Sequence, residues 1–95
     1  MGSKKQYSEE PFIEEVLRSD IGTDRSLILH NDDVHTFEYV IDSLIEVCEH
    51  DSLQAEQCTY LVHYKGKCNV KTGSFSLLKP MKEGLTDRGL KATIN

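Results

Sequence analysis

The sequence predicts an α+β fold, a single small domain in which three helices pack on a small, mainly antiparallel, three-stranded sheet. Apolar residues recur at helical spacing in three segments, and short apolar or alternating runs lie before, between and after those segments. In chain order they give strand, helix, helix, strand, helix, strand, without an internal repeat. The 95 residues, 38% of them hydrophobic, suffice for one such domain with a modest core.

The first strand and helix are predicted within residues 26–48. Ser26–His30 is a short apolar run bounded by turn residues, as in a buried strand. The Asn-Asp-Asp sequence after it favours a turn, because each of these side chains can bond nearby backbone amides. Thr36 is then expected to cap a helix with 3.6-residue apolar spacing. The apolar positions of that helix are Phe37, Val40, Ile41, Leu44 and Cys48.

The second helix and strand follow from similar signals. Asp51 or Ser52 is expected to open the helix, which should end near Tyr64, before Gly66. Its predicted apolar face consists of Ala55, Cys58, Leu61 and Val62. Residues 68–73 are predicted to form the second strand.

The third helix is expected to begin at a cap provided by Ser74 or Ser76. Pro80 favours the later start, because the missing N–H of a proline is no loss in the first turn. Gly89 occupies the position typical of a helix C-terminus. The predicted core side is Leu77, Leu78, Met81 and Leu85, and the alternation over residues 90–94 predicts a closing strand.

Residues 1–25 differ in composition from the rest of the chain. They are polar and mixed in charge, which predicts a flexible N-terminal extension before a domain spanning residues 26–95. Met1-Gly2-Ser3 is typical of a cloning remnant.

Net charge and hydropathy exclude two classes of partner. A net charge of −5 argues against nucleic acid, which rewards basic surfaces. No apolar run approaches the ~20 residues that a membrane span needs, and no signal-peptide core is present. An odd number of cysteines without a secretion signal is typical of the reducing cytoplasm, where we expect the protein to reside.

The cysteines and acidic residues do not predict a metal, a cofactor or an enzyme. Cys48 and Cys58 lie at apolar helix positions, so we interpret them as buried small hydrophobes. Pairing them with His50 and His63 gives none of the usual spacings of a zinc site. No nucleophile motif or phosphate-binding loop is present. An acid–base set of Asp32, Asp33 and His63 would still lack a nucleophile.

The charge distribution favours the binding of a protonated amine. Residues 26–64 carry eight acidic side chains and no Lys or Arg, whereas the chain from Lys65 onward carries seven basic and two acidic residues. The acidic segment contains Asn31, Asp32 and, after 29 intervening residues, His63. An amide oxygen, a carboxylate and a neutral imidazole are acceptors for a cationic donor, and a negative field favours its arrival.

The same residues have purely structural interpretations. The side chains of the turn can serve as helix caps, a role to which we assign Asp33, and His63 can bond a backbone carbonyl at a helix end. Phe37, Val40 and Leu90 are of types that more often belong to a core.

The stretch LILHNDDVHTFEYVIDSLIEVCEHDSLQAEQCTYLVHYKGKC resembles the ClpS family, the adaptors of the bacterial Clp protease. The resemblance covers about residues 26–95. It depends on NDD after the first strand, the E-[FY]-V-I-x-x-L helix at Glu38–Leu44, and V-H-Y-x-G-K at Val62–Lys67. The HYKGKC sequence and the short third helix resemble members of the Bacteroidetes type.

The resemblance implies an N-degron adaptor without catalytic activity of its own. Such a protein binds substrates that begin with a bulky hydrophobic residue and hands them to an AAA+ unfoldase, here one with a ClpA- or ClpC-like N-terminal domain. On the family pattern, Asn31, Asp32 and His63 would hold the free α-ammonium. The residues that match the family's hydrophobic pocket are Phe37, Val40, Thr59, Val62 and Leu90.

Two departures from the family pattern concern the pocket. Many members have Tyr-Thr-Pro-Met after NDD, where this chain has Val34-His35-Thr36-Phe37, and Thr59 stands where a bulky Met is usual. The amino-acid preference is therefore left open. The basic residues of the second half form a candidate unfoldase surface on charge alone, although an ordinary solvated face explains them as well. These residues are Lys65, Lys67, Lys71, Lys79, Lys82, Arg88 and Lys91.

Two other functions remain as alternatives. The first is a ClpS-like regulator of the unfoldase that does not bind N-degrons. The second is a small metal- or redox-responsive binding domain that uses Cys48, Cys58 and the histidines.

Overall fold

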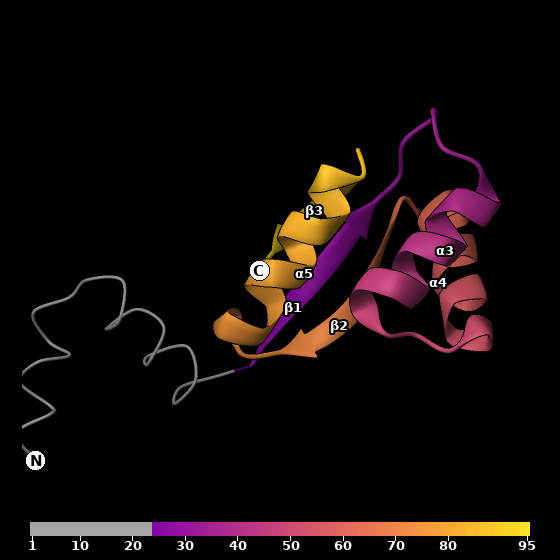
Figure 1. Ribbon diagram of the computed structural model, residues 1–95. Coiled ribbons are helices and arrows are strands. Elements are labelled where there is room, and N and C mark those ends of the chain that lie inside the picture. Colours follow the sequence, from indigo (N-terminus) through magenta and orange to yellow (C-terminus); the bar gives the residue numbers. More distant parts are fainter. Residues whose placement is uncertain (1–23) are drawn as a thin grey trace, which may run out of the picture.

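A computed structural model describes residues 24–95, which form three strands and three helices (Figure 1). The elements are β1 (Arg25–His30), α3 (Phe37–Cys48), α4 (Ser52–Lys65), β2 (Lys67–Gly73), α5 (Phe75–Asp87) and β3 (Lys91–Ile94). The predicted α+β order is confirmed. The flexible extension predicted for residues 1–25 lies almost entirely outside the described residues.

The three described strands form one antiparallel sheet in the order β2-β1-β3, with β1 at its centre. Leu27 and Leu29 of β1 are completely buried beneath the helices, whereas the residues that alternate with them are partly exposed. The pairing of β1 with β2 shifts after Leu27, where Val70 is the extra residue of a β-bulge. The last residue of β1, His30, pairs with Lys67 of β2 on one side and with Lys91 of β3 on the other.

Side-chain caps fix where each helix begins. The Thr36 hydroxyl accepts from the amide N–H of Tyr39, and the Asp51 carboxylate accepts from that of Gln54. Thr36 was predicted as a cap, and Asp51 was one of the two residues expected to open the second helix. At the other end of α4, Gly66 adopts a φ of 93°, which favours glycine and ends the helix.

The later start predicted for α5 is wrong. Ser74 is the N-cap, since its hydroxyl accepts from the amide N–H of Leu77, and Pro80 lies within the helix. The N–H that Pro80 lacks would have pointed back only to the first turn, so a single bond is lost close to the helix end.

The buried face of α4 differs from the prediction at two positions, and that of α5 at one. Leu61 and Leu77 are exposed, whereas Thr59 is 3% exposed and its hydroxyl donates to the carbonyl of Ala55. A helix can bury a threonine at low cost when its own backbone accepts the hydroxyl proton. The buried face of α4 is therefore Ala55, Cys58, Thr59 and Val62.

The core lies between the helices and one face of the sheet. It contains Leu27, Leu29, Val40, Leu44, Cys48, Ala55, Cys58, Val62, Cys68, Val70, Leu78, Leu85, Leu90 and Ala92. None of the helices in residues 24–95 combines the length and the apolar character that a transmembrane span requires.

Candidate functional site

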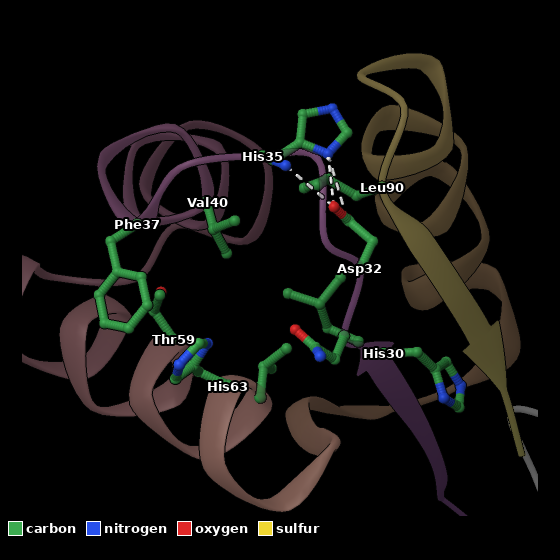
Figure 2. A pocket seen from close by; sticks show the side chains of 11 residues that line it. His30, Asp32, His35, Phe37, Val40, Thr59, His63 and Leu90 are labelled. Atoms are coloured by element: carbon green, nitrogen blue, oxygen red, sulfur yellow. Dashed lines mark hydrogen bonds and ion pairs between the residues drawn. The ribbon is translucent and has the colours of Figure 1, made fainter.

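A cavity opens at the carboxyl end of β1, between the turn that leads into α3, the second half of α4 and the residue before β3 (Figure 2). Including the part open to solvent, it measures about 350 Å³. Its lining consists of Leu29, His30, Asn31, Asp32, His35, Phe37, Val40, Thr59, Val62, His63 and Leu90. All eight residues predicted for the site thus line a single cavity.

The deeper part of the cavity is apolar. Val40, Val62 and Leu90 are buried and come from α3, α4 and the segment between α5 and β3. Thr59 adds little polarity, because its hydroxyl already donates to the carbonyl of Ala55. This part of the cavity suits an uncharged side chain.

Phe37 lies at the α4 side of the cavity, near Thr59 and His63 (Figure 2). Its ring meets the rings of Tyr60 and His63 edge-on, with centroids 5.2 Å and 5.0 Å away. These contacts hold the half-buried Phe37 ring against α4.

The carboxylate of Asp32 organises the turn at the mouth of the cavity. Its Oδ1 accepts from the backbone N–H groups of Val34 at 2.8 Å and His35 at 3.0 Å. The capping role assigned to Asp33 is therefore wrong: Asp32 makes the bonds within the turn, and Thr36 caps the helix. Burial alone would raise the pKa of Asp32, but the bonds from His35 and Val34 outweigh it and lower the pKa. The carboxylate is therefore ionised at neutral pH.

His35 is a cavity residue that sequence reasoning missed. Its Nδ1 lies 3.0 Å from Oδ1 and 3.1 Å from Oδ2 of Asp32. The imidazole stacks on Tyr39 at 4.8 Å, and the Tyr39 hydroxyl donates to the carbonyl of Arg88. On the other side, a Cβ on Gly89 would lie 3.2 Å from Nε2 of His35. The only signal in the sequence is a histidine three residues after an aspartate in a turn.

Asn31 and His63 reach the cavity from the ends of β1 and α4. The backbone N–H of Asn31 donates to the carbonyl of Gly66, which ties the two ends together. Within residues 24–95, neither the Asn31 side chain nor the His63 ring has a hydrogen bond or an ion pair. The predicted alternative of a carbonyl bond for His63 is therefore wrong, and both groups are open to a ligand.

His30 also lines the cavity, but its ring points away from it toward β3 (Figure 2). Its Nε2 lies 2.8 Å from the Thr93 hydroxyl. His30 therefore contributes to the cavity wall without presenting its imidazole to the interior.

The three cysteines are buried free thiols, as predicted for Cys48 and Cys58. Burial raises the pKa of Cys48 to about 11 and that of Cys58 to about 12, so both stay protonated. His50 bonds the carbonyl of Val70 at 2.6 Å. Across residues 24–95, no three His, Cys, Asp or Glu side chains are grouped to hold a metal ion.

Comparison with known protein families identifies the class. Residues 23–93 match the family described as ATP-dependent Clp protease adaptor protein ClpS. Because the match spans most of the chain, the protein belongs to the ClpS family, whose members are adaptors of the Clp protease rather than enzymes. The family predicted from the NDD and V-H-Y-x-G-K sequences is thereby confirmed.

One solved structure supports the fold independently. The structure of Agrobacterium tumefaciens ClpS2 bound to L-phenylalaninamide is similar to this chain with a TM-score of 0.67 and 19% sequence identity. The similarity covers 77% of this chain and 95% of the other. No curated protein matches the chain.

Proposed function

We propose that this protein binds N-degron substrates through their free α-amino group and bulky hydrophobic N-terminal residue, and delivers them to an AAA+ unfoldase of the Clp type. The carrying observation is the cavity itself, which combines an apolar interior with an ionised carboxylate, Asp32, and with two polar side chains, Asn31 and His63, that have no hydrogen-bond partner among residues 24–95. The structural neighbour is described as bound to L-phenylalaninamide, a molecule with a free α-amino group and a benzyl side chain.

The three polar residues suit an ammonium group in different ways. An ammonium has three N–H donors and needs acceptors from several directions when it leaves water. The amide oxygen of Asn31 and a neutral nitrogen of His63 are free to accept. Oδ1 of Asp32 already has three donors, so Asp32 contributes its charge and its less occupied Oδ2.

The apolar lining suits the side chain of the first residue. Burying a Leu or Phe side chain against Val40, Val62 and Leu90 is worth roughly 1.5–3 kcal/mol. The polar groups then fix the orientation of that residue, because a blocked or displaced amine leaves them unpaired.

A peptide titration tests the binding step. Peptides that start with Leu or Phe should bind, and the same peptides with an acetylated N-terminus should not. The acetyl group removes the positive charge and two of the three donors without changing the side chain. Equal affinity for free and acetylated peptides, or no binding of either, would favour a regulator of the unfoldase that does not recognise N-degrons.

We further propose that delivery takes place in the cytoplasm. The unfoldase that receives the substrate would have a ClpA- or ClpC-like N-terminal domain. Family membership supports the Clp partner. Adding the protein to a reconstituted Clp protease should accelerate degradation of a Leu-starting substrate, and an acetylated substrate should show no acceleration.

A further inference from the structure

Four rings form a continuous cluster beside the cavity. Phe37 comes from α3, and Tyr60, His63 and Tyr64 come from α4. The Tyr60 and Tyr64 rings stack in parallel at 5.9 Å, and Tyr64 meets His63 edge-on at 5.0 Å. Phe37 meets both Tyr60 and His63 edge-on, which closes the cluster. We call these four residues the aromatic rim.

Helix packing accounts for only part of the aromatic rim. Phe37 joins α3 to α4 through its two ring contacts. Tyr64, however, is 73% exposed, and among the described residues its ring contacts are only with Tyr60 and His63 of its own helix. Tyr60 is 45% exposed. Exposed aromatic rings that are contiguous and held by one another are typical of binding surfaces.

The aromatic rim is continuous with the cavity, since Phe37 and His63 belong to both. Figure 2 shows these two side chains on the same side of the opening. Consecutive Cα atoms of a polypeptide are about 3.8 Å apart, and side chains of an extended chain point alternately to opposite sides. When the first side chain of a bound polypeptide fills the cavity, the second side chain must therefore lie outside, on its edge.

We infer that the aromatic rim binds the side chain of the second residue of the substrate and prefers an aromatic or large aliphatic side chain there. This inference rests on the proposed function and adds a second determinant of substrate choice. Tyr rings suit this role because they offer a large apolar area and lose little conformational freedom on binding. An acidic second residue would find no cationic partner within the rim.

Four peptides with Leu first and Phe, Leu, Gly or Asp second test the inference by calorimetric titration. The Phe peptide should bind about five- to tenfold more tightly than the Gly peptide, as expected for an aromatic pair at a partly exposed site. Tyr64→Ala and Tyr60→Ala should each reduce this ratio, and the double variant should bring it close to one.

Two matched controls accompany these variants. Leu53→Ala removes an exposed apolar side chain from the same helix, away from the cavity, and should leave the ratio unchanged. Tyr64→Phe keeps the ring and should keep the ratio, which separates ring contact from a general disturbance of α4. Melting temperatures identify any variant that fails to fold.

The outcomes are distinguishable. Binding of all four peptides with equal affinity, or a ratio that survives the double variant, would overturn the aromatic-rim inference and leave the proposed function intact. A preference for Asp would also overturn it and place the second residue near Lys91. Failure of every peptide to bind would overturn the proposed function and this inference together.

Discussion

Asp32 and His35 are joined side chain to side chain, with Nδ1 of His35 3.0 Å and 3.1 Å from the two carboxylate oxygens. The same carboxylate accepts two backbone N–H groups of its own turn, and the imidazole is held between Tyr39 and Gly89. The Asp32 carboxylate, with its negative charge, is therefore held in one orientation at the cavity mouth before any ligand binds.

Two substitutions separate the charge of Asp32 from its structural role. Asp32→Asn keeps an oxygen that can accept the turn bonds, so it should weaken peptide binding by about tenfold through loss of charge, with little change in stability. Asp32→Ala removes the acceptor as well and should lower the free energy of unfolding by about 1–2 kcal/mol. Urea unfolding and peptide titration measure the two effects. Equal destabilisation by both variants would contradict this division.

Removal of the His63 imidazole should affect binding far more than folding. His63→Ala deletes an acceptor that has no bond within the described protein, and should weaken a Leu-starting peptide by at least ~1.5 kcal/mol, because an ammonium donor is left unpaired. The melting temperature should change little. His30→Ala serves as the histidine control, since that ring points away from the cavity. Similar losses of affinity in the two variants would argue against a direct role for His63.

Acid should destabilise the protein partly through Asp32. The folded-state pKa of this carboxyl is lowered from its ordinary value of 3.8, so its stabilising contribution is present above that pH and is lost as the pH falls below it. The difference in unfolding free energy between wild type and Asp32→Ala should therefore narrow as the pH falls from about 4 to about 2. A constant difference across that range would contradict the lowered pKa.

Thr59 should determine how well the cavity tolerates β-branched first residues. A Met side chain is longer than Thr, so Thr59→Met should fill the space that the second methyl of Ile requires. One methyl-sized misfit is worth ~1–3 kcal/mol, which predicts about a tenfold loss for Ile-starting relative to Leu-starting peptides. The Leu peptide is the internal control for folding. An unchanged Ile-to-Leu ratio would contradict the argument.

Residues 1–20 should matter for delivery and not for degron binding. The described lining of the cavity runs from Leu29 to Leu90, so we expect that deletion of residues 1–20 leaves peptide affinity intact. The family resemblance predicts that residues 1–20 engage the unfoldase, so their deletion should slow degradation of a delivered substrate. Unchanged degradation in a reconstituted assay would show that the extension has no part in delivery.

The sequence predicted the features that depend on local chemistry. Helical spacing and turn residues located all six elements of residues 24–95, and Thr36 was recognised as a cap because it precedes an apolar helix. The eight cavity residues came from family motifs. The position of His35 escaped prediction because it depends on Tyr39 and on Gly89, which lies 54 residues later in the chain. The local pattern around Pro80 also predicted the wrong start for α5. The helix begins after the cap at Ser74, and Pro80 lies inside it.

Leu90 closes the cavity from the last turn before β3, and β3 is held in place by pairing with the central strand β1. During synthesis, a ribosome releases the NDD turn and α4 well before it releases this final wall. A growing chain therefore has the polar groups of the site before it has the complete apolar chamber. Under the proposed function, capture of degrons begins only when the adaptor has been made through Ile94, so an unfinished adaptor leaves substrates free.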